Sequence, residues 1–84
     1  MNPFLREILH AILAGQQIFQ SGGSSMEALA QFQPTAKALR YAFEQGYLDK
    51  AHFHRETSSG NSSYDWIRVN NGLSYKGTEL LTTD

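Results

Sequence analysis

Apolar residues recur every three or four positions near the start of the chain, which predicts a helix from Pro3 to about residue 19. They are Phe4, Leu5, Ile8, Leu9, Ile12 and Leu13. At 100° per residue they cover an arc of roughly 180°, which is wider than the single stripe of a surface helix. Such a helix is either covered on two sides by its own domain or packed against a second copy. In the second case we expect a homodimer whose contact includes Phe4, Ile8 and Leu13.

Two further helices are expected before Gly46. The serine and glycine run at residues 21–25 forms a turn, and a serine at its end can cap a short helix that starts at Met26. Pro34 is expected to end that helix, because a proline disfavours helical conformation in the residue before it and suits the first turn of the next helix. The third helix then runs to Gln45, and Gly46 stops it. Its core side is expected to hold Ala36, Leu39, Ala42 and Phe43.

Two alternating stretches rich in aromatic and β-branched residues, 51–57 and 64–69, predict an antiparallel hairpin with a polar tip at residues 58–63. The register that groups the aliphatic side chains places Phe53 opposite Val69 and Arg55 opposite Ile67. The buried face would then hold Phe53, Ile67 and Val69. The other face would carry His52, His54, Glu56, Tyr64, Trp66 and Arg68. A slipped register or a covering C-terminus would instead bury Trp66.

The end of the chain is expected to turn at Asn71-Gly72 and to form a short helical segment over residues 73–81. Its two leucines, Leu80 and Leu81, are expected to dock on the body of the protein.

The composition is that of one globular domain spanning residues 1–84, with 40% hydrophobic and 18% charged residues. The chain contains no cysteine, which excludes a disulfide framework and a cysteine-based zinc site. Charged residues interrupt the first apolar pattern, so no signal peptide is expected. No apolar run approaches the ~20 residues needed to cross a bilayer, and we expect a cytoplasmic protein without membrane contact.

The formal net charge is −1, but residues 37–77 carry six basic and four acidic side chains and therefore a net +2. This mild excess is compatible with a nucleic-acid partner and far weaker than the footprint of a strongly basic protein.

The order of three helices, a hairpin and a short C-terminal element resembles the winged helix-turn-helix superfamily. Residues 39–48 are similar to the end of the recognition helix in MarR- and PadR-like regulators. Residues 73–81 resemble the segment that follows the wing in those families and in small YjcQ-like winged helices. The expected fold is therefore α+β, with three helices followed by a β-hairpin wing and a short C-terminal helical segment.

The resemblance implies a candidate DNA-binding surface. The recognition helix of such a protein enters the major groove, so Gln33, Lys37, Arg40 and Tyr41 would read bases. Arg55 and Arg68 would contact phosphates from the wing. The alternative is a solvated helix face with ordinary charges, on which Glu44 would repel phosphate. The wing tip also lacks the lysines and arginines that DNA-binding wings tend to carry.

Other candidate sites are weaker. His52, His54 and Glu56 would project from one face of a strand, but a metal needs a further ligand, so we expect neither a metal nor a cofactor. Serines lie in turn clusters and no phosphate-binding glycine loop follows a strand, so we expect no enzyme. Trp66, with Tyr64 beside it, would form an aromatic and cationic patch suited to a protein interface or to single-stranded bases.

The sequence therefore predicts a winged-helix DNA-binding module, similar to transcription regulators and without catalytic activity. The alternative is a winged helix that binds a protein through its wing. A continuous positive surface that joins Lys37, Arg40, Arg55 and Arg68 would favour nucleic acid, whereas scattered charge would favour a protein partner.

Overall fold

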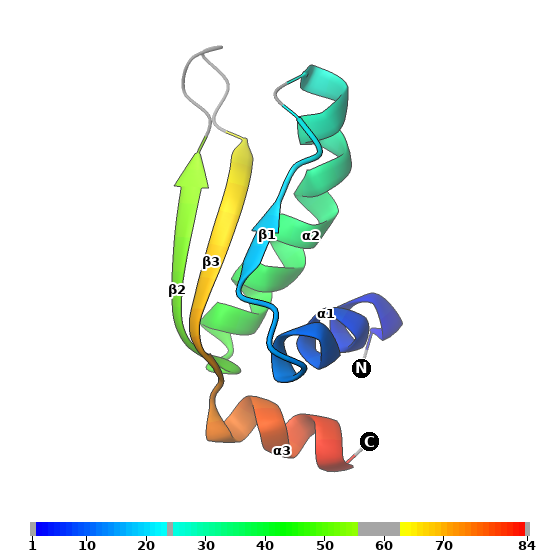
Figure 1. Ribbon diagram of the computed structural model, residues 1–84. Coiled ribbons are helices and arrows are strands. Elements are labelled where there is room, and N and C mark those ends of the chain that lie inside the picture. Colours follow the sequence, from blue (N-terminus) through cyan, green and yellow to red (C-terminus); the bar gives the residue numbers. More distant parts are fainter. Residues whose placement is uncertain (1, 24, 56–62, 84) are drawn as a thin grey trace.

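The chain forms three helices and a three-stranded antiparallel sheet in a computed structural model that describes residues 2–23, 25–55 and 63–83 (Figure 1). Along the chain the elements are α1 (Pro3–Leu13), β1 (Ile18–Gln20), α2 (Met26–Glu44), β2 (Leu48–Arg55), β3 (Tyr64–Leu73) and α3 (Tyr75–Thr83). The strand order is β1-β3-β2. The α+β class is confirmed. The element order differs from the expected one, because two helices precede the hairpin and the third follows it.

Helix α1 ends earlier than predicted because Gly15 takes a left-handed backbone conformation (φ 113°). The backbone N–H of Gln16 donates to the Ala11 carbonyl (3.0 Å) and closes the last turn around that glycine. The predicted extension to residue 19 is therefore wrong. Instead, Ile18–Gln20 forms β1, which pairs with β3.

Helix α2 runs without interruption through Pro34, so the predicted break between a second and a third helix is wrong. Ser25 caps it, as expected of a serine there, because its Oγ accepts from the Ala28 N–H (3.1 Å). Pro34 has no N–H to donate to the Ala30 carbonyl, which weakens the helix locally. Burial of one apolar stripe on both sides of the proline offsets that loss. The stripe consists of Leu29, Phe32, Ala36, Leu39 and Ala42.

Gly46 ends the helical region as predicted, with a φ of 82°. The Tyr47 N–H donates to the Ala42 carbonyl (2.9 Å), a bond that reverses the chain around the glycine. This reversal leads directly into β2, whose first residue, Leu48, is buried.

The predicted hairpin is confirmed, but its predicted register is wrong by two residues. Phe53 lies opposite Ile67, and Ala51 lies opposite Val69. Side chains alternate with a period of two along a strand, so this shift leaves most faces as predicted. Ile67 and Val69 are fully buried against the helices.

Tyr64 lies on the other face from the one predicted, because β3 has one extra residue, Asp65, between the pairs His54–Trp66 and Arg55–Tyr64. This bulge turns Tyr64 towards the helices, where its ring centroid lies 5.6 Å from that of Phe53. Residues 56–62, which include Glu56 and most of the predicted tip, lie outside the described residues.

The core lies between the sheet and the helices, and α3 closes one end of it beside α1 (Figure 1). The predicted C-terminal helical segment is confirmed, with Leu81 buried and Leu80 half-buried. Ser74 ties this helix to the end of α2, since its Oγ accepts from the Gly77 N–H (3.1 Å) and donates to the Gly46 carbonyl (2.5 Å). Among the described helices, none is both long enough and apolar enough to cross a membrane.

Candidate functional site

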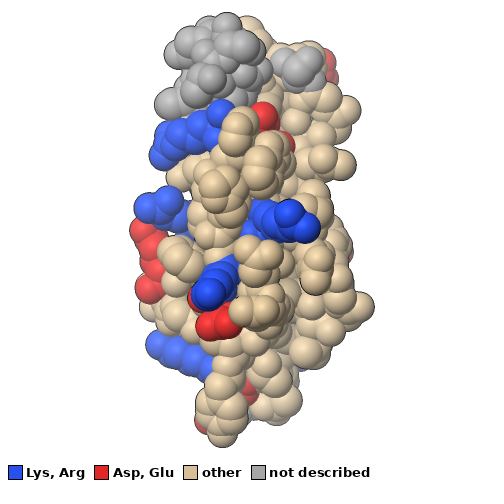
Figure 2. All heavy atoms as spheres, turned by 60° about the vertical axis from the view of Figure 1, so that its left-hand side comes forward, with Lys and Arg blue, Asp and Glu red and all other residues tan. Residues whose placement is uncertain are grey.

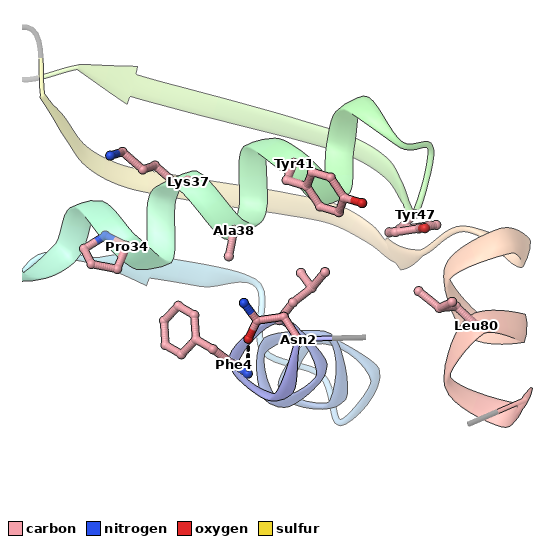
Figure 3. Close-up of a pocket in the computed structure, with 9 residues that line it drawn as sticks. Asn2, Phe4, Pro34, Lys37, Ala38, Tyr41, Tyr47 and Leu80 are labelled. Carbon is pink, nitrogen blue, oxygen red and sulfur yellow. Dashed lines mark hydrogen bonds between the residues drawn. The ribbon is translucent and has the colours of Figure 1, made fainter.

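A groove of about 640 Å³ lies where α1, α2 and α3 meet, and we call it the three-helix groove. Figure 3 shows α1 on one side of it, α2 on the other, and Tyr47 with Leu80 at one end. The residues that line it are Asn2, Phe4, Leu5, Pro34, Lys37, Ala38, Tyr41, Tyr47 and Leu80. Most of them are apolar or aromatic, so the groove offers a surface for apolar side chains.

Local structure fixes the aromatic side chains of the groove. Asn2 caps α1 by accepting from the Phe4 N–H (2.8 Å), and Pro3 occupies the first turn. On α2, Pro34 and Tyr41 lie two turns apart and therefore face the same side of the helix. The turn at Gly46 then places the Tyr47 ring in an edge-on contact with Tyr41, with 6.5 Å between the ring centroids.

The groove is unusual in how much aromatic surface it leaves in contact with solvent. Phe4 is 42% exposed and Tyr41 is 49% exposed, although both lie on helices whose other faces form the core. Lys37 is the one charged residue among those that line the groove. A smaller hollow beside it shares Tyr47 and Leu80 and adds Lys76 and Glu79. The ammonium of Lys76 lies 5.6 Å from the Tyr47 ring centroid. The rim of the apolar floor therefore carries two lysines and one glutamate.

Two of the residues predicted to read DNA, Lys37 and Tyr41, belong to this groove and are exposed. The other four of the six residues predicted to contact DNA lie elsewhere: Gln33 and Arg40 on other sides of α2, Arg55 on β2 and Arg68 on β3. The structure therefore does not gather the six predicted residues into one surface.

Among the residues predicted to read DNA bases, Gln33 has the environment that differs most from an open helix face. Its side-chain N–H groups donate to the carbonyls of Leu29 (2.7 Å) and Tyr64 (2.8 Å), and its Oε1 accepts from the Tyr64 N–H (3.2 Å). The side chain thus pairs with the backbone of Tyr64 much as a neighbouring strand would. It is half-buried and holds α2 against β3, so its polar groups are already engaged within the domain.

Arg40 and Arg55 meet at the ring of Tyr64, between α2 and the hairpin. Arg40 donates to Glu44 (3.2 Å) and to the Tyr64 hydroxyl (3.3 Å). Arg55 donates to the same hydroxyl (3.0 Å), and its guanidinium carbon lies 4.5 Å from the Tyr64 ring centroid. The hydrogen bond to Glu44 is the largest of the causes that raise the pKa of Arg40, and the guanidinium stays protonated. This arginine pair is engaged with its own domain.

Arg68 lies on the outer face of the sheet, opposite Ile18 on one side and His52 on the other. The predicted DNA contacts are thus divided among the groove, the arginine pair and the outer face. Figure 2 shows basic side chains separated from one another and interleaved with acidic ones on the face in view. The basic side chains predicted to contact DNA therefore do not form one continuous positive surface.

The three residues predicted at a homodimer contact have different environments. Ile8 is only 6% exposed and belongs to the core, which leaves little of its side chain accessible to a second copy. Phe4 lines the three-helix groove, and Leu13 is 55% exposed at the end of α1. Leu13 lies nine positions after Phe4, which places the two on opposite sides of the helix.

His52 and His54 project from the same face of β2, as predicted. In the described part of the chain, no group of three or more histidine, cysteine or acidic side chains could hold a metal ion. His54 instead has its Nδ1 at 2.7 Å from Asp65 Oδ1.

Sequence reasoning did not find the three-helix groove, because the groove depends on where α3 docks. One signal was present: Phe4 and Tyr41 are large side chains that fall beside the core stripes of their helices. Comparison of the chain with protein-family models, curated proteins and solved structures gives no match. The function is therefore argued from these side chains alone.

Proposed function

We propose that this chain is a non-catalytic binding module that holds an apolar segment of a partner protein in the three-helix groove. The observation that carries the proposal is the pair of half-exposed aromatic rings, Phe4 and Tyr41, on the two walls of an apolar groove of about 640 Å³. Exposed aromatic side chains on rigid helices are typical anchors of protein interfaces, because they bury much area and lose little side-chain entropy.

The charged side chains at the rim of the groove indicate which kind of segment would bind there. Lys37 lines the groove, and Lys76 lies beside it over Tyr47. A segment with apolar anchors and a carboxylate beside Lys37 would complement the groove, whereas Glu79 already offsets the charge of Lys76 in the hollow next to it. We propose a cytoplasmic location for the domain, and we propose the fold as a divergent winged helix. In that description α2 replaces the usual second and third helices, and β2 with β3 forms the wing.

Selection from a random peptide library displayed on phage tests the proposal. We expect the wild-type protein to enrich peptides that combine aromatic or aliphatic anchors with acidic residues. Ala38→Glu places a carboxylate on the groove wall and should abolish binding of the selected peptides. Tyr41→Ala should weaken it at least tenfold, because a buried aromatic anchor is lost.

Met26→Ala is the matched control, since Met26 is 75% exposed at the start of α2 and does not line the groove. The affinity of the Met26→Ala variant for the selected peptides should equal that of the wild type. A selection without convergence, or peptides that bind the Ala38→Glu variant equally well, would count against the proposal.

Binding of duplex DNA is the second candidate, and it is favoured by the exposure of Lys37 and Tyr41 one turn apart on α2. If this face enters a major groove, the affinity should fall with salt by a slope of about −0.9 in log K against log salt for each neutralised phosphate. Fluorescence anisotropy with duplex DNA at low ionic strength measures this. Lys37→Glu and Arg40→Glu should both abolish binding, and His10→Ala should not.

The two candidates are separable by Arg40, which does not line the three-helix groove. Arg40→Glu should leave peptide binding unchanged, whereas Lys37→Glu should weaken both activities. Absence of anisotropy change with the wild type, or binding indifferent to Lys37 and Arg40, would exclude the DNA candidate.

A further inference from the structure

The outer face of the sheet carries a second group of side chains, unrelated to the three-helix groove. Cross-strand pairing places His54 opposite Trp66 and His52 opposite Arg68. Lys50, two residues before His52, points to the same side because side chains alternate along a strand. We call these five residues the outer-face group. All are exposed except Trp66, which is half-buried.

The rings of this group stack on one another and form one compact aromatic cluster, and we call its solvent-exposed side the aromatic surface. The His54 and Trp66 rings are parallel within 7°, with 4.9 Å between their centroids. The His52 ring lies 5.2 Å from Trp66 at an angle of 35°. Asp65 holds His54 in place through the 2.7 Å contact with its Nδ1. The rings are therefore ordered before any ligand arrives, which lowers the entropic cost of stacking on them.

The charges around the rings are predominantly positive. Arg68 and Lys50 form no ion pair within the described part of the chain. The carboxylate of Asp65, which directly precedes Trp66 on β3, is already engaged by His54. A ligand of this face would therefore meet an aromatic surface flanked by two cations.

We propose that the outer-face group binds single-stranded nucleic acid, with a base stacked on the aromatic surface and phosphates beside Arg68 and Lys50. Aromatic side chains on an open sheet, flanked by cations, are the arrangement that recognises unstacked bases. Charge complementarity with phosphate favours this ligand over a protein segment. The proposal concerns a face other than the groove and does not depend on peptide binding there.

The test uses a fluorescein-labelled oligothymidylate of about ten nucleotides, a length within the usual site size of such surfaces. Trp66 is the single tryptophan of the chain, so its emission reports directly on stacking. We expect saturable quenching of that emission together with a rise in anisotropy. Trp66→Ala should weaken binding about tenfold. Arg68→Gln should weaken it a few-fold and reduce the salt slope by about 0.7.

Three controls make the result decisive. Arg6→Gln removes a cation from α1, which packs on the core side of the sheet and carries no residue of the outer-face group, and should leave binding unchanged. An abasic oligonucleotide of equal length and a duplex should both bind more weakly, because neither offers an unstacked base. Arg68 is exposed, so Arg68→Gln remains informative even if Trp66→Ala fails to fold.

Three outcomes would overturn the proposal. The first is an unchanged Trp66 emission at saturating oligonucleotide. The second is equal affinity for the abasic strand, which would indicate attraction of phosphate alone. The third is a loss of affinity with Arg6→Gln as large as that with Arg68→Gln. Trp66-dependent binding of peptides without any binding of oligonucleotide would assign this face to a protein instead.

Discussion

A glycine is required at position 46 because of the backbone conformation there, although the structure has room for a side chain. The φ of Gly46 is 82°, and a Cβ built there would meet only the flexible Lys76 side chain, at 3.9 Å. We expect Gly46→Val to destabilise the protein by more than about 1 kcal/mol, because a β-branched residue is strongly disfavoured in left-handed conformation. Thermal melting measures the effect. Gly22→Val is the control, since Gly22 has open space and no such φ. Equal melting temperatures for both variants would contradict the prediction.

Gly77 is required for the opposite reason. Its position in α3 is one where alanine would ordinarily be favoured by about 1 kcal/mol. Here a Cβ would lie 3.1 Å from the carbonyl carbon of Tyr47 and closer still to its oxygen. Since backbone must move, we expect Gly77→Ala to destabilise the protein by about 1–3 kcal/mol. Urea unfolding measures the sign and the size of this change in the free energy of unfolding. A stabilised variant would show that α3 docks differently.

At the scale of elements, Gln33 connects α2 to the start of β3. We expect Gln33→Ala to cost about 1–3 kcal/mol, because it leaves the half-buried N–H and carbonyl of Tyr64 without their partner. Amide hydrogen exchange by NMR should show faster exchange at Tyr64. Gln31→Ala, at an exposed position of the same helix, should change neither quantity. Unaltered protection of the Tyr64 amide in the Gln33 variant would be evidence against this connection.

Pro34 is a weak point inside α2. An alanine there could donate to the Ala30 carbonyl and would suit a helix interior better than proline by about 3 kcal/mol. Greater freedom of the unfolded chain offsets about 1 kcal/mol of that gain. Pro34→Ala should therefore stabilise the protein by about 2 kcal/mol in chemical denaturation. A loss of stability would mean that α2 needs the proline ring to keep its path along the core.

At the scale of the whole molecule, the wide apolar arc of α1 is only partly used by the core. Leu13 is 55% exposed, and Ile18 nearby in the chain is 42% exposed. We expect a homodimer in which Leu13 crosses the contact, because apolar side chains left exposed together favour association. Sedimentation velocity at high protein concentration measures it, with Leu13→Asp expected to give monomers and Glu7→Gln expected to behave as the wild type. A monomeric wild type would rule out this assembly.

Local signals in the sequence determined much of the fold. Apolar spacing gave α1, the Gly46 turn gave the end of α2, and alternation gave the hairpin and most of its faces. These features depend on neighbours a few residues apart, which is why sequence is sufficient for them. Gly15 carried the same kind of signal as Gly46 and would have placed the end of α1 correctly.

The tertiary structure decided the rest, because the competing terms are non-local. Whether Pro34 breaks a helix depends on the apolar surface that a continuous α2 buries, and this requires the sheet and α1 to be in place. The bulge at Asp65, which turns Tyr64 inward, is set by the contacts of β3 with α2. Likewise, the three-helix groove and the division of the six predicted DNA-binding residues among separate surfaces follow from how the helices dock. Sequence determined which side chains are present, and only packing determined which of them share a surface.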